Sequence, residues 1–540
     1  MVDNILNSHE PIFFDSEAMF KFLVYLLINI IVFVPIIRSK NKIFLLLAYF
    51  IQGIYIFTHL AYFLYFKEVF RIQQSVLQFK EGIELARHFA IPKDFKYSIV
   101  LLDIPFFAYF VICFSKYCKS MAVNLKNINL RRMLFFLCII FVILFYRNGN
   151  SADGFFESKG FNKNDAIKYG IFANDIFNIA SLRFQNLLIK NLSYGKEIVF
   201  KNSETGRFNN IVCIQVESLD ANIVDYQFKG KYIAPFLHEL TFDSIYYPYL
   251  LTYPSVGATS DTEFTIINGL IPFRMLPYYS FTRYDYPNSL IKELSVSGFQ
   301  TMAFHNNGGD YFNRNRTFAK MGFDKFYDFK KMELIEYGWG GKDGDLFNFV
   351  QNKLKQQKRP FMYYIITMSS HEPYQNVRLY YSNNHYDCIK RGLIRDYFNS
   401  MSYVDSALRD IVLFIKDNVP DTYIFIFGDH FFHSHDNILF KPSGLKYAGE
   451  YLMAVPLFII TPDGQRHREN NKIASMLDME LSILYASGIS FDIKSKGIDL
   501  TDFSIREDRV ILPFYTVGSR ETLFKKFDHK KKEALLCTEK

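Results

Sequence analysis

The chain has 540 residues, of which 50% are hydrophobic and 18% aromatic, and its 62 basic and 54 acidic side chains give a net charge of +8. The apolar content excludes a disordered chain, and only 6 cysteines exclude a disulfide scaffold. A balance of +8 over this length is too mild to indicate a nucleic-acid-binding protein. Most of it lies in residues 1–150, which hold 16 basic and 9 acidic side chains.

Residues 1–150 are predicted to form a transmembrane domain of about four helices. The four apolar segments are Met19–Ile37, Ile43–Phe66, Tyr97–Ser115 and Met133–Tyr146. A helix needs about 20 apolar residues to span the hydrocarbon layer, so the fourth segment is short for a span. Acidic residues before the first segment, with no cleavage site after it, argue against a cleaved signal peptide.

The charges of the connecting loops predict the orientation of this domain. Residues 38–42 and 116–132 contain basic but no acidic side chains, whereas the segment before the first span has no Lys or Arg. Basic loops stay on the cytoplasmic side, so both termini are predicted outside. We therefore expect a multi-pass protein of the cell inner or plasma membrane with an extracytoplasmic C-terminal domain.

The remainder divides into a membrane-surface linker at 151–203, a catalytic domain at 204–525 and a basic tail at 526–540. In the catalytic domain, β-rich runs alternate with helical periods, which predicts a mainly parallel sheet with helices on both faces. The predicted strands are Asn210–Val216, Gln300–His305, Phe361–Thr367, Thr422–Phe427 and Leu457–Ile460. The predicted helices are Ser260–Gly269, Leu290–Ser297, Ile394–Asn418 and Asn471–Ser487.

Polar side chains follow several of the predicted strands at the point where each strand ends. They are Glu217, His305, His371, Asp429 and His430. Open α/β sheets bind ligands at the carboxyl ends of their strands. Carboxylates grouped with an imidazole are ligands for a divalent cation, so this edge of the sheet is predicted to hold a metal site.

The segment Tyr253–Gly269 supplies a candidate nucleophile. Gly257 contributes to a turn, after which Thr259 or Ser260 falls at the N-terminus of a helix. Free N–H groups and the helix dipole favour anions such as phosphate at that end. The alternative is an ordinary capping box formed by Ser260 and Glu263. Both interpretations hold if Ser260 caps the helix while Thr259 faces the substrate.

Taken in order, these motifs resemble the lipoteichoic acid synthase branch of the alkaline phosphatase/sulfatase superfamily. The resemblance covers roughly residues 205–500 and extends to the layout of a membrane domain followed by an outer domain. The segments that carry it are Glu217, Gly257–Asp261, Phe304–Phe326, Trp339–Asp343, Ser370–Pro373 and Gly428–His430.

The resemblance implies one divalent ion, manganese with magnesium or zinc as alternatives, whose ligands match Glu217, Thr259, Asp429 and His430. It also implies that Thr259 attacks the head group of a membrane phospholipid, releases diacylglycerol and becomes a phosphothreonine. A cell-surface glycan or glycolipid then accepts the group, with His371 as an acid/base or a phosphate ligand. Such a protein is integral in the membrane and has no nucleic-acid partner.

The residues implied to bind the substrate leave the head group open. They are His305, Asn307, Phe312, Arg314 and His371. Members that transfer phosphoglycerol usually have Asp and Trp where this chain has Asn307 and Phe312. Phosphoglycerol transfer is the first hypothesis, phosphoethanolamine transfer to lipopolysaccharide or another surface glycan the second, and an inactive lipid- or glycan-binding scaffold the third. Sulfatase activity is disfavoured, because sulfatases need a Cys/Ser-x-Pro-x-Arg motif and Val256–Thr259 offers none.

Overall fold

The structure is a computed structural model in which the chain forms two compact units, Met1–Leu192 and Ser193–Lys540. The predicted spans at 19–37, 97–115 and 133–146 and the tail beyond 527 lie outside the described residues. The structure describes residues 42–66, 175, 198–202, 206–254, 257–272, 284–358, 360–372, 374–389, 392–432, 444–447, 450–505, 507–512 and 517–527.

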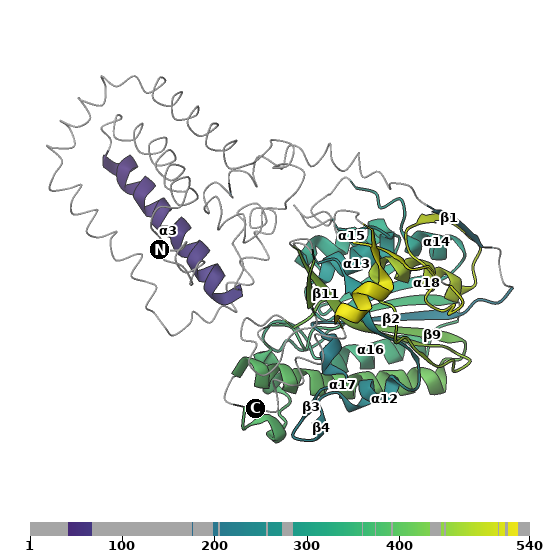
Figure 1. The fold of residues 1–540 in the computed structure, drawn as a ribbon. Helices are drawn as coiled ribbons and strands as arrows, with labels where there is room; N and C mark the ends of the chain where they lie inside the picture. The colour runs from purple at the N-terminus through teal and green to yellow at the C-terminus, as the bar shows by residue number, and fades with distance from the viewer. Residues whose placement is uncertain are drawn as a thin grey trace. The chain divides into compact units, whose positions relative to one another are not determined.

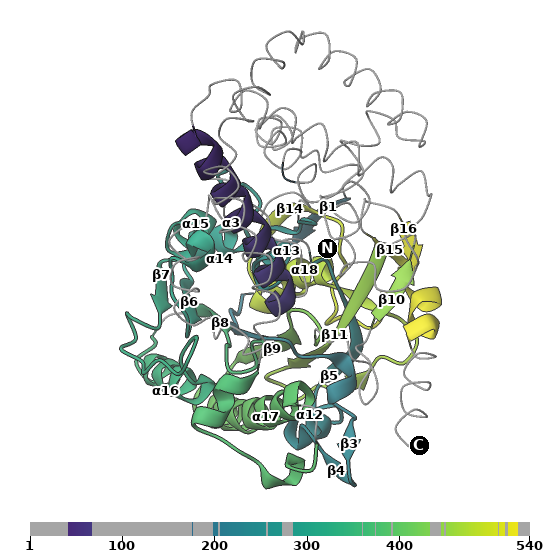
Figure 2. The same cartoon turned by 90° about the vertical axis from the view of Figure 1, so that its left-hand side faces the viewer.

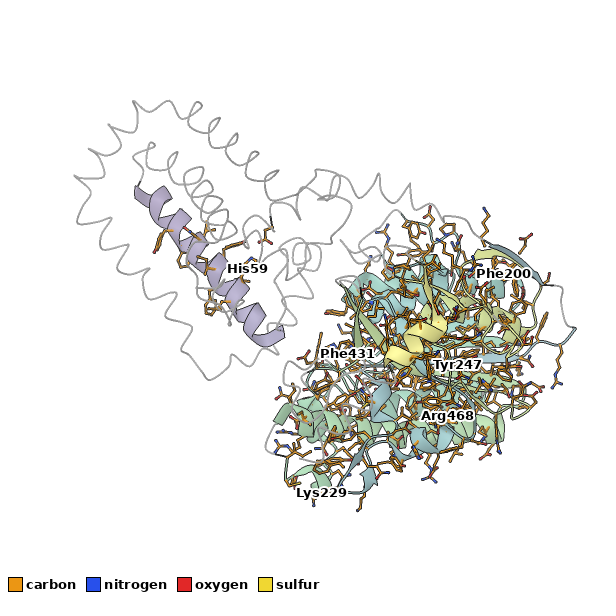
Figure 3. The ribbon with its side chains drawn as sticks, in the orientation of Figure 1. His59, Phe200, Lys229, Tyr247, Phe431 and Arg468 are labelled. Carbon is orange, nitrogen blue, oxygen red and sulfur yellow. The ribbon has the colours of Figure 1, made fainter. Side chains whose placement is uncertain are left out.

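In the first unit, helix α3 (Lys42–Phe66) occupies the second predicted apolar segment. The Tyr55 hydroxyl donates to the Asp175 carboxylate at 2.5 Å, and Nε2 of His59 lies 3.0 Å from the same oxygen. Both His59 (labelled in Figure 3) and Asp175 are buried. Within the part of the chain that the structure describes, no helix combines the length and the apolar character needed to cross a membrane.

The second unit is built around one large sheet. Five neighbouring strands run parallel, in the order β9, β2, β8, β6, β7. Their bounds are Thr422–Gly428, Asn210–Val216, Phe361–Ile366, Gln300–His305 and Lys325–Asp328. Strands covered on both faces consist of nearly continuous apolar residues, and all six residues of β8 are buried. The prediction of a mainly parallel sheet is confirmed.

Antiparallel strands extend this sheet beyond β9. Strand β11 (Glu450–Ile460) pairs antiparallel with β9, with β5 (Ile245–Thr252) and with β10 (Gly444–Tyr447). Two short strands, β12 (His467–Arg468) and β13 (Ala474–Ser475), run parallel to β5. Three small two-stranded sheets complete the unit: β1–β14 (Ile198–Asn202, Phe491–Ser495), β3–β4 (Gln227–Phe228, Lys231–Tyr232) and β15–β16 (Arg509–Ile511, Val517–Ser519).

Helices cover both faces of the sheet, as Figures 1 and 2 show. On one face lie α13 (Thr259–Asn268), α14 (Leu290–Val296), α15 (Arg314–Met321) and α18 (Met476–Ser487). On the other face lie α12 (Pro235–Leu240), α16 (Asp343–Leu354) and α17 (Gly392–Asn418). The longest of these, α17, buries residues at helical spacing, such as Tyr397, Met401, Val404, Leu408 and Ile411, against the sheet.

Two predicted elements differ from the structure by more than two residues at one end. The predicted strand Leu457–Ile460 begins at Glu450 in the structure, and the register against β5 shifts between Val455 and Leu457, around Pro456. The predicted helix Asn471–Ser487 begins only at Met476. Ahead of it, the residues that were expected to be helical include strand β13, and Ser475 then caps the helix.

A buried ion pair holds the first turn of α18. Asp478 accepts hydrogen bonds from Nη1 and Nη2 of Arg520 at 2.7 and 2.8 Å, and both side chains are at most 2% exposed. The same carboxylate accepts from the backbone N–H groups of Ser475 and Ile498. Arg520 follows β16, so the pair ties the C-terminal hairpin to the helix.

Candidate metal and phosphate site

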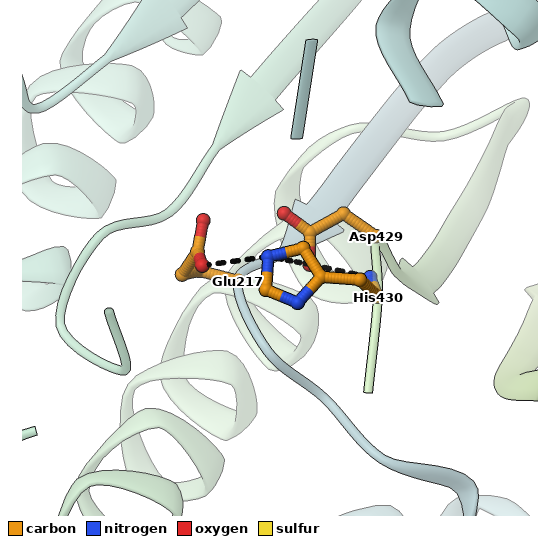
Figure 4. Close-up of side chains that lie close together, drawn as sticks. All are labelled: Glu217, Asp429 and His430. Atoms are coloured by element: carbon orange, nitrogen blue, oxygen red, sulfur yellow. Dashed lines mark hydrogen bonds and ion pairs between the residues drawn. The ribbon is translucent and has the colours of Figure 1, made fainter. Parts of the chain in front are cut away.

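Glu217, Asp429 and His430 lie together at the carboxyl ends of β2 and β9 (Figure 4). The two strands are parallel neighbours in which Val216 pairs with Gly428, so the residues that follow them emerge side by side. Nε2 of His430 lies 3.0 Å from Oε1 of Glu217 and 3.7 Å from Oδ1 of Asp429. All three are buried, and the predicted grouping of these side chains is present.

The surroundings of Asp429 leave one of its carboxylate oxygens for a ligand. Oδ1 accepts from the backbone N–H groups of Ser218 and His430, at 2.9 and 2.7 Å. Oδ2 is buried and has no hydrogen-bond partner among the described residues. Gly428 precedes the carboxylate because a Cβ there would lie 2.4 Å from the carbonyl oxygen of Leu219. Since an unsatisfied buried oxygen is costly, a cation at this point would stabilise the site.

The electrostatics of the cluster also fit a divalent cation. Burial raises the pKa of Asp429, and the neighbouring Glu217 raises it further. Burial works against protonated His430, but the two carboxylates outweigh it and raise the pKa of this imidazole. Despite burial, His371 and His430 in their protonated forms hold the pKa of Glu217 well below its usual range. The carboxylates therefore require positive charge between them, which a metal ion would supply in place of a proton on His430.

Thr259 is the first residue of α13 and faces this cluster. Its hydroxyl donates to Oε2 of Glu217 at 3.1 Å, and its carbonyl accepts from the side chain of Gln215 at 3.1 Å. The turn before it is tight: Ala258 has a φ of 40°, and a Cβ on Gly257 would lie 2.1 Å from the Ser260 hydroxyl oxygen. This turn places the Thr259 hydroxyl at the positive end of the helix dipole.

The predicted capping box of Ser260 and Glu263 is wrong. The Ser260 hydroxyl donates to the Gly257 carbonyl at 3.4 Å, and Glu263 is engaged by Arg314 instead. Nε and Nη2 of Arg314 donate to Oε1 of Glu263 at 3.1 and 2.5 Å. A helix that starts at Thr259 puts Glu263 one turn further along the same face, directed into the protein and not back to the helix start.

Glu263 is the residue that the sequence interpretation missed, and its effect is to orient Arg314. Burial raises the pKa of Glu263 although the guanidinium opposes the shift. Both side chains are nearly inaccessible, and Nη1 of Arg314 is buried without a hydrogen-bond partner among the described residues. A fixed guanidinium with an unused donor is suited to holding a phosphate oxygen.

Three histidines of the site share one arrangement. Nδ1 of His305 lies 3.1 Å from the carbonyl oxygen of Ile366, and Nδ1 of His371 and of His430 lie 2.7 and 3.1 Å from the carbonyl of the following residue. A carbonyl only accepts, so each Nδ1 carries hydrogen. Burial lowers the pKa of both His305 and His371, which are therefore neutral with a lone pair on Nε2.

Aromatic rings lie beside these polar groups. Phe312, at a φ of 57°, places its ring 4.9 Å from the guanidinium carbon of Arg314. Trp339, the single Trp of the chain, contacts His371 edge to face with 4.3 Å between ring centroids. The amide nitrogen of Asn307 lies 3.7 Å from the sulfur of Met368. The predicted substrate residues therefore lie at or beyond the carboxyl ends of β6 and β8, with His305 at the end of β6 and Arg314 at the start of α15.

The Asp429→Asn variant should lower the affinity of the site for a divalent cation more than about 100-fold, because an amide brings no charge to the cation. Isothermal titration of the full chain in detergent with Mn²⁺, Mg²⁺ and Zn²⁺ measures this. Asp243→Asn is the matched control, since Asp243 is an exposed carboxylate that pairs with Lys416. An unchanged affinity in Asp429→Asn would mean that the cation binds elsewhere.

The chain is similar to curated lipoteichoic acid synthases over part of its length. The chain is 26% identical over 346 residues to lipoteichoic acid synthase 2 of Bacillus subtilis, which covers 61% of the chain and 52% of that protein. The chain thus spans about half the length of the curated relatives it matches.

Two solved structures share the fold. One is the lipoteichoic acid synthase LtaP from Listeria monocytogenes, with a TM-score of 0.50, 19% identity and coverage of 62% of this chain and 95% of that one. The other is the lipooligosaccharide phosphoethanolamine transferase A from Neisseria meningitidis, with a TM-score of 0.55, 14% identity and coverage of 90% and 91%.

The sulfatase family matches residues 209–489, just over half of the chain. This range begins at the first strand of the parallel sheet, contains Glu217, Thr259, Asp429 and His430, and ends after α18. The superfamily assignment made from the motifs is confirmed: the chain belongs to the sulfatase family.

Proposed function

We propose that the chain transfers a phosphoglycerol-type head group from a membrane phospholipid to a cell-surface glycan or glycolipid, through a phosphothreonine on Thr259. The observation that carries the proposal is the Thr259 hydroxyl, 3.1 Å from the Glu217 carboxylate, at the N-terminus of α13. A hydroxyl in this position, and not the cysteine or serine that a sulfatase modifies, favours transfer of a phosphoryl-linked group. The names of the relatives favour the same chemistry.

Glu217, Thr259, Asp429 and His430 would hold one divalent ion, and we propose manganese, with magnesium or zinc as alternatives. When bound, such an ion lowers the pKa of a coordinated hydroxyl and neutralises charge that develops on the phosphoryl oxygens. The chain's own residues orient the reactants. Glu217 accepts the hydroxyl hydrogen of Thr259, and the tight turn at Gly257 and Ala258 keeps that oxygen directed at the site.

The reaction proceeds in two exchanges at phosphorus. In the first, the Thr259 oxygen forms a bond to phosphorus, the bond from phosphorus to the diacylglycerol oxygen breaks, and the proton lost by Thr259 is matched by the one diacylglycerol gains. In the second, an acceptor hydroxyl displaces Thr259, whose oxygen regains a proton as its bond to phosphorus breaks. Neutral His371, with its Nε2 lone pair, takes the proton of that hydroxyl, while Arg314 holds a phosphoryl oxygen through Nη1.

The head group would be recognised by His305, Asn307 and Phe312. Neutral His305 offers Nε2 as an acceptor for a hydroxyl, which favours glycerol. The alternative is phosphoethanolamine transfer to lipopolysaccharide or another surface glycan. Asn307 favours that alternative, because phosphoglycerol-transferring members usually have Asp at this position. The third alternative, an inactive scaffold, has no need of a buried carboxylate oxygen left open for a cation.

We further propose that residues 1–150 anchor the chain in the cell inner or plasma membrane, with residues 204–525 on the extracytoplasmic side. The support is the four apolar segments and the basic loops at 38–42 and 116–132. The placement gives the catalytic domain access to phospholipid and to the acceptor glycan. Cysteine accessibility at Lys40 and at Asp502, each replaced in turn, tests the two sides of the membrane.

The activity is tested by incubating the full chain with Mn²⁺ and vesicles of head-group-labelled phosphatidylglycerol or phosphatidylethanolamine, followed by mass spectrometry. We expect glycerophosphate on the peptide that contains Thr259. Labelling by the ethanolamine lipid alone would select the second hypothesis. Labelling by neither lipid, with metal bound, would refute transfer and leave the scaffold.

A further inference from the structure

Three loops at the carboxyl edge of the sheet meet around the carboxylate of Asp343, the first residue of α16. His305 is the last residue of β6, and the loop that follows it carries Asn307. The loop before α16 carries Trp339, and the loop after β8 carries His371. Asp343 is completely buried. It contacts none of the three residues grouped at the metal site in the contacts that the structure describes, so its role is separate from metal binding.

The carboxylate joins the first and third loops directly. Oδ1 of Asp343 accepts from the Asn306 side-chain amide at 2.8 Å and from the backbone N–H groups of Met368 and Ser369 at 2.8 and 3.2 Å. In return, the N–H of Asp343 donates to the Ser369 hydroxyl at 3.0 Å. Asn306 adjoins two of the substrate-facing residues, and Ser369 lies two residues before the third.

The loop that carries Trp339 packs closely against Asn306 and Met368, two of the residues that donate to Asp343. The N–H of Gly341 donates to the Asn306 carbonyl at 2.7 Å, and the Asn306 amide donates back to the Gly341 carbonyl at 2.8 Å. At Gly340, with a φ of 136°, a Cβ would lie 2.7 Å from Cγ of Met368. The absence of a side chain there lets the segment that carries Trp339 approach closely.

The donors that surround Asp343 are neutral amides and a hydroxyl. Burial raises its pKa to about 6, and the hydrogen bonds from Met368, Asn306 and Ser369 counter that shift by favouring the carboxylate. The three loops lack regular ladder hydrogen bonds of their own at this point. Strands β6 and β8 pair as far as His305 and Ile366, and beyond that pair the hydrogen bonds to the Asp343 carboxylate link the loops that follow the two strands.

We propose that Asp343 is a positioning residue that fixes the separation between the loop of Asn307, which begins directly after His305 at the end of β6, and the loop of His371. The proposal rests on the proposed function, since those side chains act on substrate only there. Asp343 itself does not touch the reacting atoms. It acts by keeping His305 and His371 at the separation that aligns a bound phosphodiester between them. A displacement of a reacting group by about 1 Å can change a rate about 100-fold.

The test is the Asp343→Asn variant of the full chain. The N–H of Ser369 also lies 3.3 Å from Oδ2 of Asp343. An amide nitrogen in place of Oδ2 would face this N–H as donor against donor, so the loop should move away. We expect kcat/KM for the labelled lipid to fall about 10- to 100-fold. Because the chain has a single tryptophan in contact with His371, we also expect acrylamide to quench Trp339 fluorescence at least about twice as efficiently.

Asp345→Asn is the matched control, because Asp345 is an acid in the same first helical turn and has the same relation to the helix dipole. It should leave both readouts at wild-type values. Wild-type labelling together with wild-type quenching in folded Asp343→Asn would overturn the positioning role. Failure of the wild-type chain to label Thr259 would instead refute the proposed function, while the fluorescence comparison would still decide whether Asp343 holds the loops.

If Asp343→Asn does not fold, a second variant, Asn306→Ala, tests whether Asp343 positions the loops. It removes one donor of the carboxylate and one of the bonds to Gly341 but leaves no charge without a partner. It should give a smaller change of the same kind in kcat/KM and in quenching, with unchanged Mn²⁺ affinity. Loss of Mn²⁺ affinity in this variant would indicate general disruption of the site and would contradict the proposal.

Discussion

The Thr259→Ala substitution should abolish transfer, lowering kcat by about 10⁴-fold or more, because the variant has no oxygen to form the bond to phosphorus. The mass-spectrometric assay should show no modified peptide at residue 259. Binding of Mn²⁺ should weaken only modestly, since Glu217, Asp429 and His430 remain in place. A Thr259→Ala variant that still transferred the head group at the wild-type rate would refute the phosphothreonine.

Two matched variants show whether the loss of transfer activity in Thr259→Ala comes from the missing nucleophile or from a disturbed structure. Thr259→Ser keeps a hydroxyl at the first position of α13 and should retain measurable labelling, now on serine. Ser260→Ala removes the adjacent hydroxyl, which donates only a long bond of 3.4 Å to the Gly257 carbonyl. It should stay within about 3-fold of wild type, since such a peripheral bond contributes little. A larger loss in Ser260→Ala than in Thr259→Ala would show that the nucleophile had been assigned to the wrong residue.

The Asp478→Asn substitution should lower the free energy of unfolding by about 3–5 kcal/mol, because Arg520 would keep its charge in a buried place without its counter-ion. The pair is at most 2% exposed, so water cannot take over the role of the carboxylate. The change also weakens the cap that Asp478 makes to the Ser475 N–H at the start of α18. Chemical denaturation of the full chain in detergent measures the difference.

Glu507→Gln is the control for this effect. Glu507 pairs with Arg509 in the same C-terminal region, but that pair lies in solvent and should leave the free energy of unfolding unchanged. Adding Arg520→Met to Asp478→Asn should restore part of the lost stability, because it removes the charge that had been left unpaired. If Asp478→Asn were as stable as Glu507→Gln, the buried pair would contribute nothing to stability.

The parallel half of the sheet could be predicted from sequence because its strands are short apolar runs with a polar residue at the end. Strands β2 and β6 coincide with the predicted ranges for this reason. Of the antiparallel half, only Leu457–Ile460 of β11 was predicted. Strand β5 contains Pro248, and β11 contains Pro456, which stands where the register between the two strands shifts. Proline removes a ladder hydrogen bond, so each of these sequences locally indicates a break in a strand. The strands form nonetheless because β5 and β11, which are distant in the sequence, pair with each other.

The candidate site was predictable to the extent that each residue follows a strand. Glu217 and Asp429 are 212 positions apart, yet their strands are neighbours in register, so they emerge together. Glu263 was misinterpreted because its spacing from Ser260 also satisfies a capping box. Its pairing with Arg314 depends on how α15 packs against α13, and that contact between distant segments leaves no local signal in the sequence.

The carbonyl groups that hold the three imidazoles belong to the main chain, and this has a consequence for altering the protein. A side-chain partner can be removed by a single substitution, but a backbone carbonyl persists through every substitution that preserves the local path of the chain. The backbone of the fold therefore determines that Nδ1 of each histidine carries the hydrogen and that Nε2 is the nitrogen left for a ligand. Under the proposed function, we expect substitutions at Asn307 or Phe312 to change head-group preference while the hydrogen positions on His305, His371 and His430 stay the same.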